Sequence, residues 1–199
     1  GDVPMRNLKY VVLTLGLALT VAACGAPPQA DLDAAKAAMD SAVTAGAGDY
    51  AAASMKAVED AQAALDAELK AQEGNWLKSY TKAKELATAV KTAGEKAAAD
   101  AAAGKETAKN EATAAIGEVK TVLTDAQALL DKAPKGKGTA ADIEAMKTDF
   151  STAATAITEA EAALAEGKFL DAKAKAQSAL TTANTVKTAV EAAMAAKKR

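Results

Sequence analysis

The side chains that could take part in chemistry are carboxylates, lysines, hydroxyls and one thiol. The 199-residue chain contains no histidine and a single cysteine, Cys24. This inventory excludes an internal disulfide, a metal site built on His or Cys, a Ser-His-Asp triad and a Cys-His pair. Carboxylate pairs with the residue types of a general acid and base are Glu159/Glu161 and Asp33/Asp40. They lie among lysines, so we expect them on solvated helix faces and predict no enzyme, cofactor or metal.

The cysteine follows an apolar run near the start of the chain. The basic stretch MRNLK begins at Met5 and precedes an apolar run over residues 10–23. Its length of about 14 residues suits the hydrophobic part of a signal segment and is short of the ~18 residues of a membrane-spanning helix. We therefore interpret residues 1–23 as a signal segment, in which residues 1–4 are a misassigned start or a cloning remnant.

The residues Val21-Ala22-Ala23-Cys24 resemble the lipobox of bacterial lipoproteins. The resemblance implies cleavage between Ala23 and Cys24, a diacylglyceryl thioether on the Cys24 sulfur and acylation of its new amino group. Two or three acyl chains hold a protein on a membrane durably, whereas one chain binds marginally. Because Gly25 is not Asp, the resemblance also implies, in a Gram-negative host, the outer membrane with the body facing the periplasm. The alternatives are an ordinary secretory signal with a coincidental cysteine and a true membrane span.

The composition of the body predicts an all-α fold. Hydrophobic residues make up 50% of the chain but aromatic residues only 3%. Alanine, which has the highest helix propensity, supplies most of the apolar share. Residues 24–30 contain Gly and two prolines and predict an extended spacer after the anchor. Acidic and basic residues are interleaved with a net charge of −2, which argues against a nucleic-acid partner.

Apolar residues recur at helical spacing along the body. We expect Asp31, Asp49 and Thr139 to cap three of the helices. Residues 75–133 form either one long helix or two that meet at Gly104, the weak point of a strong helical segment. After Asp31 the spacing predicts an inward face of Leu32, Ala35, Met39 and Val43, and after Asp49 one of Tyr50, Ala53, Ala57, Ala61, Leu65 and Leu69. Within residues 75–133 the predicted inward face is Trp76, Tyr80, Ala83, Ala87, Val90, Gly94, Ala112, Ile116, Val119, Leu123, Ala126 and Leu130. After Thr139 it is Ile143, Met146, Phe150, Ala153, Ile157, Ala160 and Leu164, and in the last helix it is Phe169, Ala172, Ala176, Leu180, Ala183, Val186, Val190 and Met194.

Two of the breaks between helices are alike. The stretch EGNWL at 73–77 matches EGKFL at 166–170, and a Lys- and Ala-rich helix follows each. We therefore predict two related three-helix units in series, 31–103 and 104–199, with antiparallel helices in an elongated bundle. The glycine-aromatic step is similar to the turn of tetratricopeptide hairpins, and a spectrin-like arrangement is the other form this architecture can take.

Aromatic residues and loop lysines are the remaining candidates for a site. Trp76 and Tyr80 are weak candidates for lining a ligand pocket, and we favour core packing at the helix ends for them, as for Tyr50. Lys135 and Lys137 in the PKGKG loop are weak candidates for contact with anionic lipid or cell-wall polymer. We interpret them instead as solvated loop residues.

The function predicted on these grounds is that of a membrane-tethered periplasmic lipoprotein, which acts as a structural or interaction module of the cell envelope. The expected partners are membrane lipid through Cys24 and an envelope protein or cell-wall polymer, whose identity the sequence leaves open together with the oligomeric state. One alternative is a carrier of a small hydrophobic ligand, held in a groove between helices. A stress-protectant helical protein is the second alternative.

Overall fold

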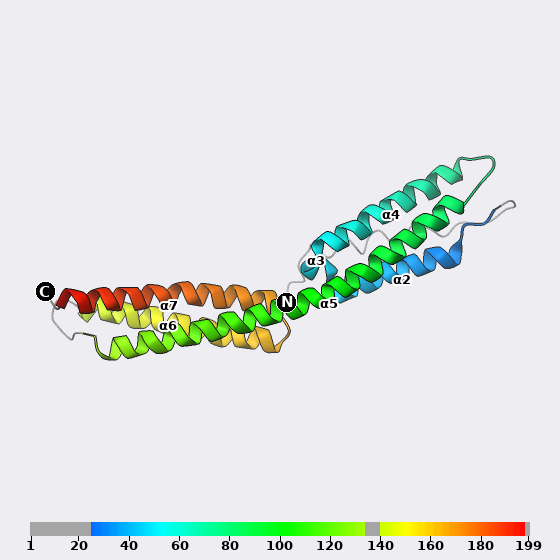
Figure 1. Ribbon diagram of the computed structural model, residues 1–199. Coiled ribbons are helices and arrows are strands. Elements are labelled where there is room, and N and C mark those ends of the chain that lie inside the picture. Colours follow the sequence, from blue (N-terminus) through cyan, green and yellow to red (C-terminus); the bar gives the residue numbers. More distant parts are fainter. Residues whose placement is uncertain (1–24, 134–139, 198–199) are drawn as a thin grey trace.

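The computed structural model describes residues 25–133 and 140–197, and within these ranges every regular element is a helix. In chain order the helices are α2 (Gln29–Ala45), α3 (Ala47–Tyr50), α4 (Ala52–Glu73), α5 (Thr81–Asp131), α6 (Ala140–Ala165) and α7 (Phe169–Lys197). Together they build an elongated rod (Figure 1), and the predicted all-α helical bundle is confirmed. The signal segment, Ala23 and Cys24 lie outside the described residues, as do Thr139 and the lysines at 135 and 137.

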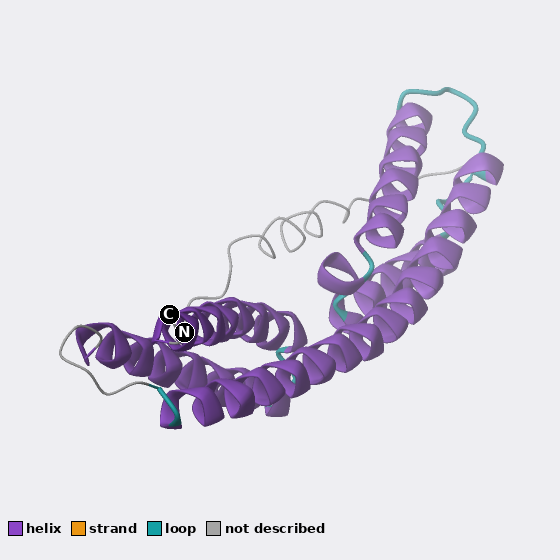
Figure 2. Ribbon diagram, turned by 60° about the vertical axis from the view of Figure 1, so that its left-hand side comes forward, coloured by secondary structure: helices purple, strands orange, loops and turns teal. Residues whose placement is uncertain are grey.

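Helix α5 extends through the whole rod (Figure 2) and takes part in two groups of helices, each with three long helices, of which the first also includes the four-residue helix α3. Helices α2, α3 and α4 pack on its first part, and α6 and α7 pack on its second part. Among the described helices, those of one group do not contact those of the other except through α5. We call these groups the first unit, which includes α5 up to Lys105, and the second unit, which includes α5 from Glu111 onward. Residues 75–133, for which the sequence allowed one helix or two, thus contain one helix of 51 residues.

Cross-helix pairs give the directions of the helices within each unit. Glu111 pairs with Lys173 at 2.7 Å and Asp125 pairs with Lys187 at 3.1 Å. Both sequence numbers rise together, so α5 and α7 run parallel, and α6, which comes between them in the chain, runs antiparallel to both. The first unit has the same up-down-up arrangement, because consecutive helices are joined by turns and reverse direction. Each unit is therefore a bundle of antiparallel neighbours whose first and third helices run parallel.

Small residues set how closely α5 approaches the helices of the first unit. A Cβ added to Gly94 would lie 2.7 Å from the carbonyl carbon of Ala38 on α2, and one added to Gly104 would overlap the carbonyl oxygen of Tyr50 on α3. Gly104 is therefore the position at which α3 packs against α5. The helix continues through it, so the prediction that two helices could meet there is corrected. Close axial approach of this kind requires residues with little or no side chain.

The buried residues form a thin apolar strip along the rod. On α5 the predicted inward face is confirmed from Ala83 to Leu130. On α7 the prediction is confirmed at Ala172, Ala176, Ala183, Val186 and Val190, whereas Leu180 is only partly buried and its neighbour Ala179 is buried instead. On α6, Ile143, Ala153 and Ile157 are buried, whereas Met146, Phe150 and Leu164 are partly buried against the same core. Within the described residues no polar or charged side chain is buried.

The faces predicted for α2 and α4 need correction. On α2, Ala35, Ala38 and Ala42 are buried, whereas Val43 is 42% exposed. On α4, Met55 and Val58 are buried in place of Ala53 and Ala57. The close approach of α2 to α5 favours alanine at the contact, and on α4 the larger side chains bury more apolar surface. Alanine occurs on every face of these helices, so its spacing carries little information.

The starts of two helices also differ from the prediction. Helix α2 begins two residues before Asp31, directly after Pro28, whose φ of −75° suits the start of a helix. Asp31 lies in the first turn, where its charge interacts favourably with the helix dipole. Asp49 belongs to the four-residue helix α3 and does not cap α4, which begins after Ala51.

Candidate functional site

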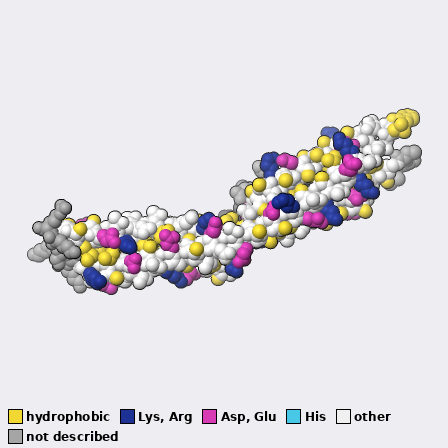
Figure 3. Space-filling model, viewed as in Figure 1, with side chains coloured by type: hydrophobic (Ala, Val, Ile, Leu, Met, Phe, Trp, Pro, Cys, Tyr) yellow, Lys and Arg dark blue, Asp and Glu magenta, His cyan; other side chains and the backbone are white. Residues whose placement is uncertain are grey.

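The most exposed large apolar side chains of the described chain lie at one end of the rod. Residues 74–80, which connect α4 to α5 and which we call the tip loop, contain Trp76 and Leu77, exposed by 96% and 81%. Hydrophobic atoms gather at this end in the space-filling view (Figure 3). The prediction that Trp76 packs in the core at a helix end is therefore wrong, and the helix predicted from residue 75 begins at Thr81.

The side chain of Gln72 connects the two ends of the tip loop. Its Oε1 accepts hydrogen bonds from the backbone N–H of Ser79 at 3.0 Å and from Nδ2 of Asn75 at 3.3 Å, one on each side of the two apolar residues. Its Nε2 donates to Oε1 of Glu68 at 2.8 Å, and Glu68 pairs with Lys82 of α5 at 3.5 Å. We call this set the Gln72 clasp. It joins both ends of the loop to α4 and leaves Trp76 and Leu77 on the outside.

The two turns with similar sequences adopt different structures. Gly167 has φ +76°, and the N–H groups of Gly167 and Lys168 bond to the carbonyls of Leu164 and Ala163 at 3.1 Å and 2.9 Å. This is a Schellman C-cap, which leads directly into α7. Gly74 has φ −84° and begins the tip loop instead. The similarity of 73–77 to 166–170 therefore does not extend to the structure of the turn.

The described chain begins against the base of the tip loop. Gly25 has φ +100°, and a Cβ added there would lie 3.4 Å from the carbonyl oxygen of Lys78 and 3.8 Å from the ring of Tyr80. Tyr80 is partly buried and packs on the cluster that includes Leu65 and Ala83, as the prediction of core packing expected. The loop between α4 and α5 and the start of α2 thus share one end of the rod (Figure 1).

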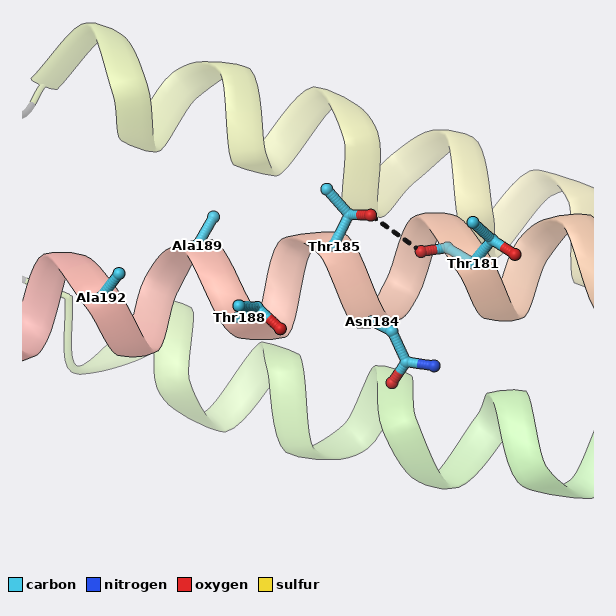
Figure 4. A pocket seen from close by; sticks show the side chains of 6 residues that line it. All are labelled: Thr181, Asn184, Thr185, Thr188, Ala189 and Ala192. Carbon is cyan, nitrogen blue, oxygen red and sulfur yellow. Dashed lines mark hydrogen bonds between the residues drawn. The ribbon is translucent and has the colours of Figure 1, made fainter.

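The predicted aromatic pair does not form a ligand pocket. Trp76 lies in solvent, whereas Tyr80 packs on the first unit, so the two rings line no common groove. A shallow hollow is present elsewhere, along α7 of the second unit (Figure 4), and its lining residues are Thr181, Asn184, Thr185, Thr188, Ala189 and Ala192. The hydroxyl of Thr185 donates to the carbonyl oxygen of Thr181 at 3.0 Å. All of these residues belong to one helix, so the hollow is a surface feature.

The carboxylates considered as acid-base candidates form surface interactions. Glu159 pairs with Lys175 at 3.0 Å, and Glu161 pairs with Lys120. The hydrogen bond from the Lys175 ammonium to Glu159 raises the pKa of that lysine, as an exposed ion pair does. On α2, Asp33 accepts from Gln29 at 2.8 Å and Asp40 from Lys36 at 2.7 Å. These groups lie on the helix surface, as the sequence predicted.

Sequence reasoning placed Trp76 in the core and did not identify the tip loop as a surface feature. The signal that could have found it is the adjacency of Trp76 and Leu77. Neighbouring residues point to different sides of a helix, so both cannot enter one core from a helical start. Between residues 25 and 197, outside the gap at 134–139, no cluster of His, Cys, Asp or Glu has the geometry to hold a metal ion.

Comparison with known proteins found no family model, curated protein or solved structure that matches the chain. None of the helices in the described part of the chain combines the length and hydropathy needed to span a bilayer. The functional argument therefore rests on the lipobox resemblance and on the geometry of the rod.

Proposed function

We propose that the chain is a lipid-anchored protein of the bacterial cell envelope, whose helical rod carries an interaction module away from the membrane. The observation that carries this proposal is the position of Gly25. It follows the lipobox cysteine directly, and it lies at one tip of the rod against Lys78 and Tyr80. A lipid attached to Cys24 would therefore hold the rod by its end, with the first unit next to the bilayer and the second unit far from it.

The length of α5 sets the distance between the two ends. Its 51 residues span about 75 Å at a rise of about 1.5 Å per residue. The far end is closed by an apolar cluster that includes Leu130, Ile143 and Val190, so the second unit is packed along its length. A packed rod of this kind is suited to presenting a surface at a defined height within the periplasm.

The second unit is the part that we assign to a partner. Its helices α6 and α7 carry exposed threonines. Their hydroxyls donate a hydrogen bond to the backbone carbonyl oxygen four residues earlier, as at Thr152, Thr181 and Thr185. Confinement to a membrane raises the local concentration of such a surface for a weak second contact. An envelope protein or a cell-wall polymer is the class of partner that this arrangement would meet.

The anchor is tested by a single substitution. Replacing Cys24→Ala in a Gram-negative host should move the protein from the membrane to the soluble periplasmic fraction, and mass spectrometry of the wild-type protein should find a lipid-modified Cys24 as the N-terminus. The matched control is Ala26→Ser, which leaves the lipobox intact and should stay in the membrane fraction. Membrane association of the Cys24→Ala protein equal to that of the wild type would refute the proposal.

The assignment of the partner surface is tested by crosslinking. A photoreactive residue placed at Thr185 of the second unit should form crosslinks in whole cells. The same residue at Thr88 of the first unit is the matched control, because both threonines are exposed and bond to the carbonyl four residues earlier at 3.0 Å. Crosslinks from position 88 and none from position 185 would assign partner binding to the other unit.

A further inference from the structure

We infer that the tip loop is a second membrane contact, in which Trp76 and Leu77 enter the interfacial layer of the bilayer that holds the lipid on Cys24. This inference rests on the proposed anchoring. The partner that we assign to the exposed apolar tip is a lipid surface. Trp76 and Leu77, which do not pack in the core of the first unit, would contact that surface.

Exposure of two large adjacent apolar side chains needs an explanation. Trp76 and Leu77 are almost fully in solvent, at 96% and 81% exposure, whereas Leu170, which occupies the position of Leu77 in the similar sequence and lies at the start of α7, is 45% exposed. Contiguous exposed apolar surface on a soluble body marks a site of contact with a partner or a membrane. The Gln72 clasp bonds to Asn75 and Ser79 on either side of the pair, so the loop is held in the form that keeps both side chains outside.

The chain itself brings this loop to the bilayer. Gly25 lies against Lys78 and Tyr80 at the base of the tip loop, and consecutive Cα atoms are about 3.8 Å apart. Because Cys24 is joined covalently to Gly25, a lipid on its sulfur would enter the bilayer on the side of the rod where Gly25 meets the loop. Acyl chains that start at Cys24 and enter the membrane must draw the loop to the same surface.

The residue types at the tip suit the interface between lipid and water. Tryptophan has an apolar ring with a polar N–H and is enriched at the headgroup level of membrane proteins. Leu77 supplies apolar surface beside it, and the exposed Lys78 follows, with an ammonium that can reach anionic headgroups while its stem lies along apolar surface. Trp76, Leu77 and Lys78 thus provide an aromatic ring, an aliphatic side chain and a cation, all exposed at the end of the rod.

A second contact changes what the anchor does. Lipid chains on one residue, joined to α2 by residues 25–28, form a single point of attachment about which the rod can change its orientation relative to the bilayer. Trp76 and Leu77 add a point of attachment on the connection between α4 and α5, so that the bilayer holds the first unit at two places. The orientation of α5 relative to the membrane is then restricted.

Trp76 is the sole tryptophan of the chain, so its fluorescence reports on the tip loop alone. Purified lipidated protein is reconstituted into vesicles of phosphatidylethanolamine and phosphatidylglycerol and checked for flotation with them. We expect emission at shorter wavelength than for the soluble Cys24→Ala protein, quenching by lipids brominated near the headgroup, and a severalfold lower acrylamide quenching constant. The matched control combines Trp76→Phe with Leu170→Trp, which places the reporter at the start of α7, where emission should be unchanged by vesicles.

Leu77→Ser provides a second measurement that leaves the reporter in place. The substitution should lower the equilibrium constant for loop insertion about tenfold, as expected from removal of part of a leucine's burial. Leu170→Ser should have no effect. Vesicle-bound protein with Trp76 still open to acrylamide would overturn the inference and leave the anchor standing. Protection of Trp76 in native envelopes but not in vesicles would also overturn it, in favour of a protein partner. Failure of the wild-type protein to float with vesicles would overturn both the anchor and the loop contact.

Discussion

The side-chain oxygen of Gln72 accepts the backbone N–H of Ser79 across the tip loop at 3.0 Å. The two residues are seven positions apart, and the segment between them contains Trp76 and Leu77. One polar side chain thus fixes the separation of the two ends of an apolar loop. The hydrogen bond is local in sequence, yet it determines which side chains the end of the rod presents.

Replacing Gln72→Ala should release the loop with little loss of stability. Two hydrogen bonds to the loop and one to Glu68 are lost, at a cost of about 1 kcal/mol for each bond that water does not replace. We expect lower steady-state fluorescence anisotropy of Trp76, because the loop gains motion. The control is Gln62→Ala, which removes a bond to Asp66 on the same helix at 2.8 Å. Equal anisotropy in the two variants would show that the clasp does not order the loop.

Three glycines of α5 should respond in opposite directions to alanine. Gly94→Ala and Gly104→Ala place a Cβ against the backbone of Ala38 and Tyr50, and overpacking of this kind costs about 1–3 kcal/mol. Gly117 has no atom within 4 Å of an added Cβ, so Gly117→Ala should stabilise the helix by about 0.5–1 kcal/mol. Thermal melts followed by circular dichroism measure the three variants against the wild type.

Gly117 serves as the internal control for this series, because it lies in the same helix and undergoes the same substitution. For a chain of this size about 1 kcal/mol corresponds to a change in Tm of roughly 2–4 °C, so the opposite signs are resolvable. A higher Tm for Gly94→Ala or Gly104→Ala would contradict the close approach of α2 and α3 to α5.

Cavities in the two units should have separate effects. Leu65→Ala in the first unit and Ile157→Ala in the second each remove a buried side chain, which costs about 2–5 kcal/mol. Because the helices of one unit contact those of the other only through α5 in the described structure, we expect each substitution to raise amide hydrogen exchange mainly in its own unit. Uniform loss of protection along the chain in both variants would indicate a single cooperative body.

The interaction between Asp100 and its neighbours should make stability depend on acid pH. Hydrogen bonds from Lys96 and then from Ser54 of α4 lower the pKa of Asp100 from its ordinary value of 3.8. Since the folded-state pKa lies below the unfolded value, the ionised carboxylate stabilises the fold above about pH 4, and this stabilisation is lost as the pH falls through the folded-state pKa. The Tm difference between the wild type and Asp100→Asn should be largest near neutral pH and should shrink in acid.

A matched substitution separates this interaction from a general effect of charge. Asp33 accepts a hydrogen bond from Gln29 on its own helix, whereas Ser54 and Asp100 join α4 to α5. We expect Asp33→Asn to change Tm less than Asp100→Asn at neutral pH. A pH-independent Tm difference for Asp100→Asn would rule out the proposed titration.

The helical class and most of the packing of α5, α6 and α7 could be predicted from the sequence. In these helices Val90, Ile116 and Ile157 recur at helical spacing among polar residues, so the inward face is marked by size. In α2 and α4 alanine occupies several faces, and the choice of Met55 over Ala53 depends on the partner helix, which periodicity does not contain. The same holds for Gly104, whose role is set by Tyr50, 54 positions away in the sequence.

The candidate site was less predictable than the fold. The helical spacing of Trp76 with Tyr80 and Ala83 and the usual burial of large aromatic residues together predicted a core position for Trp76. Its exposure depends on the Gln72 side chain and on where α5 begins, and both are tertiary features. The lipobox resemblance, in contrast, is confined to a few consecutive residues, and Cys24 lies outside the described structure, so the lipid on it stays a prediction.

The unbroken α5 makes the rod a lever. With no turn between the two units along that helix, a small tilt at the tip-loop end is transmitted to the other end and magnified by the length of the helix. For a helix of about 75 Å, a tilt of about 10° displaces the far end by about 13 Å. Under the proposed anchoring, the contacts that hold the base to the membrane would therefore govern the reach of the second unit, and altering a few residues at the base would change the volume that the second unit can search.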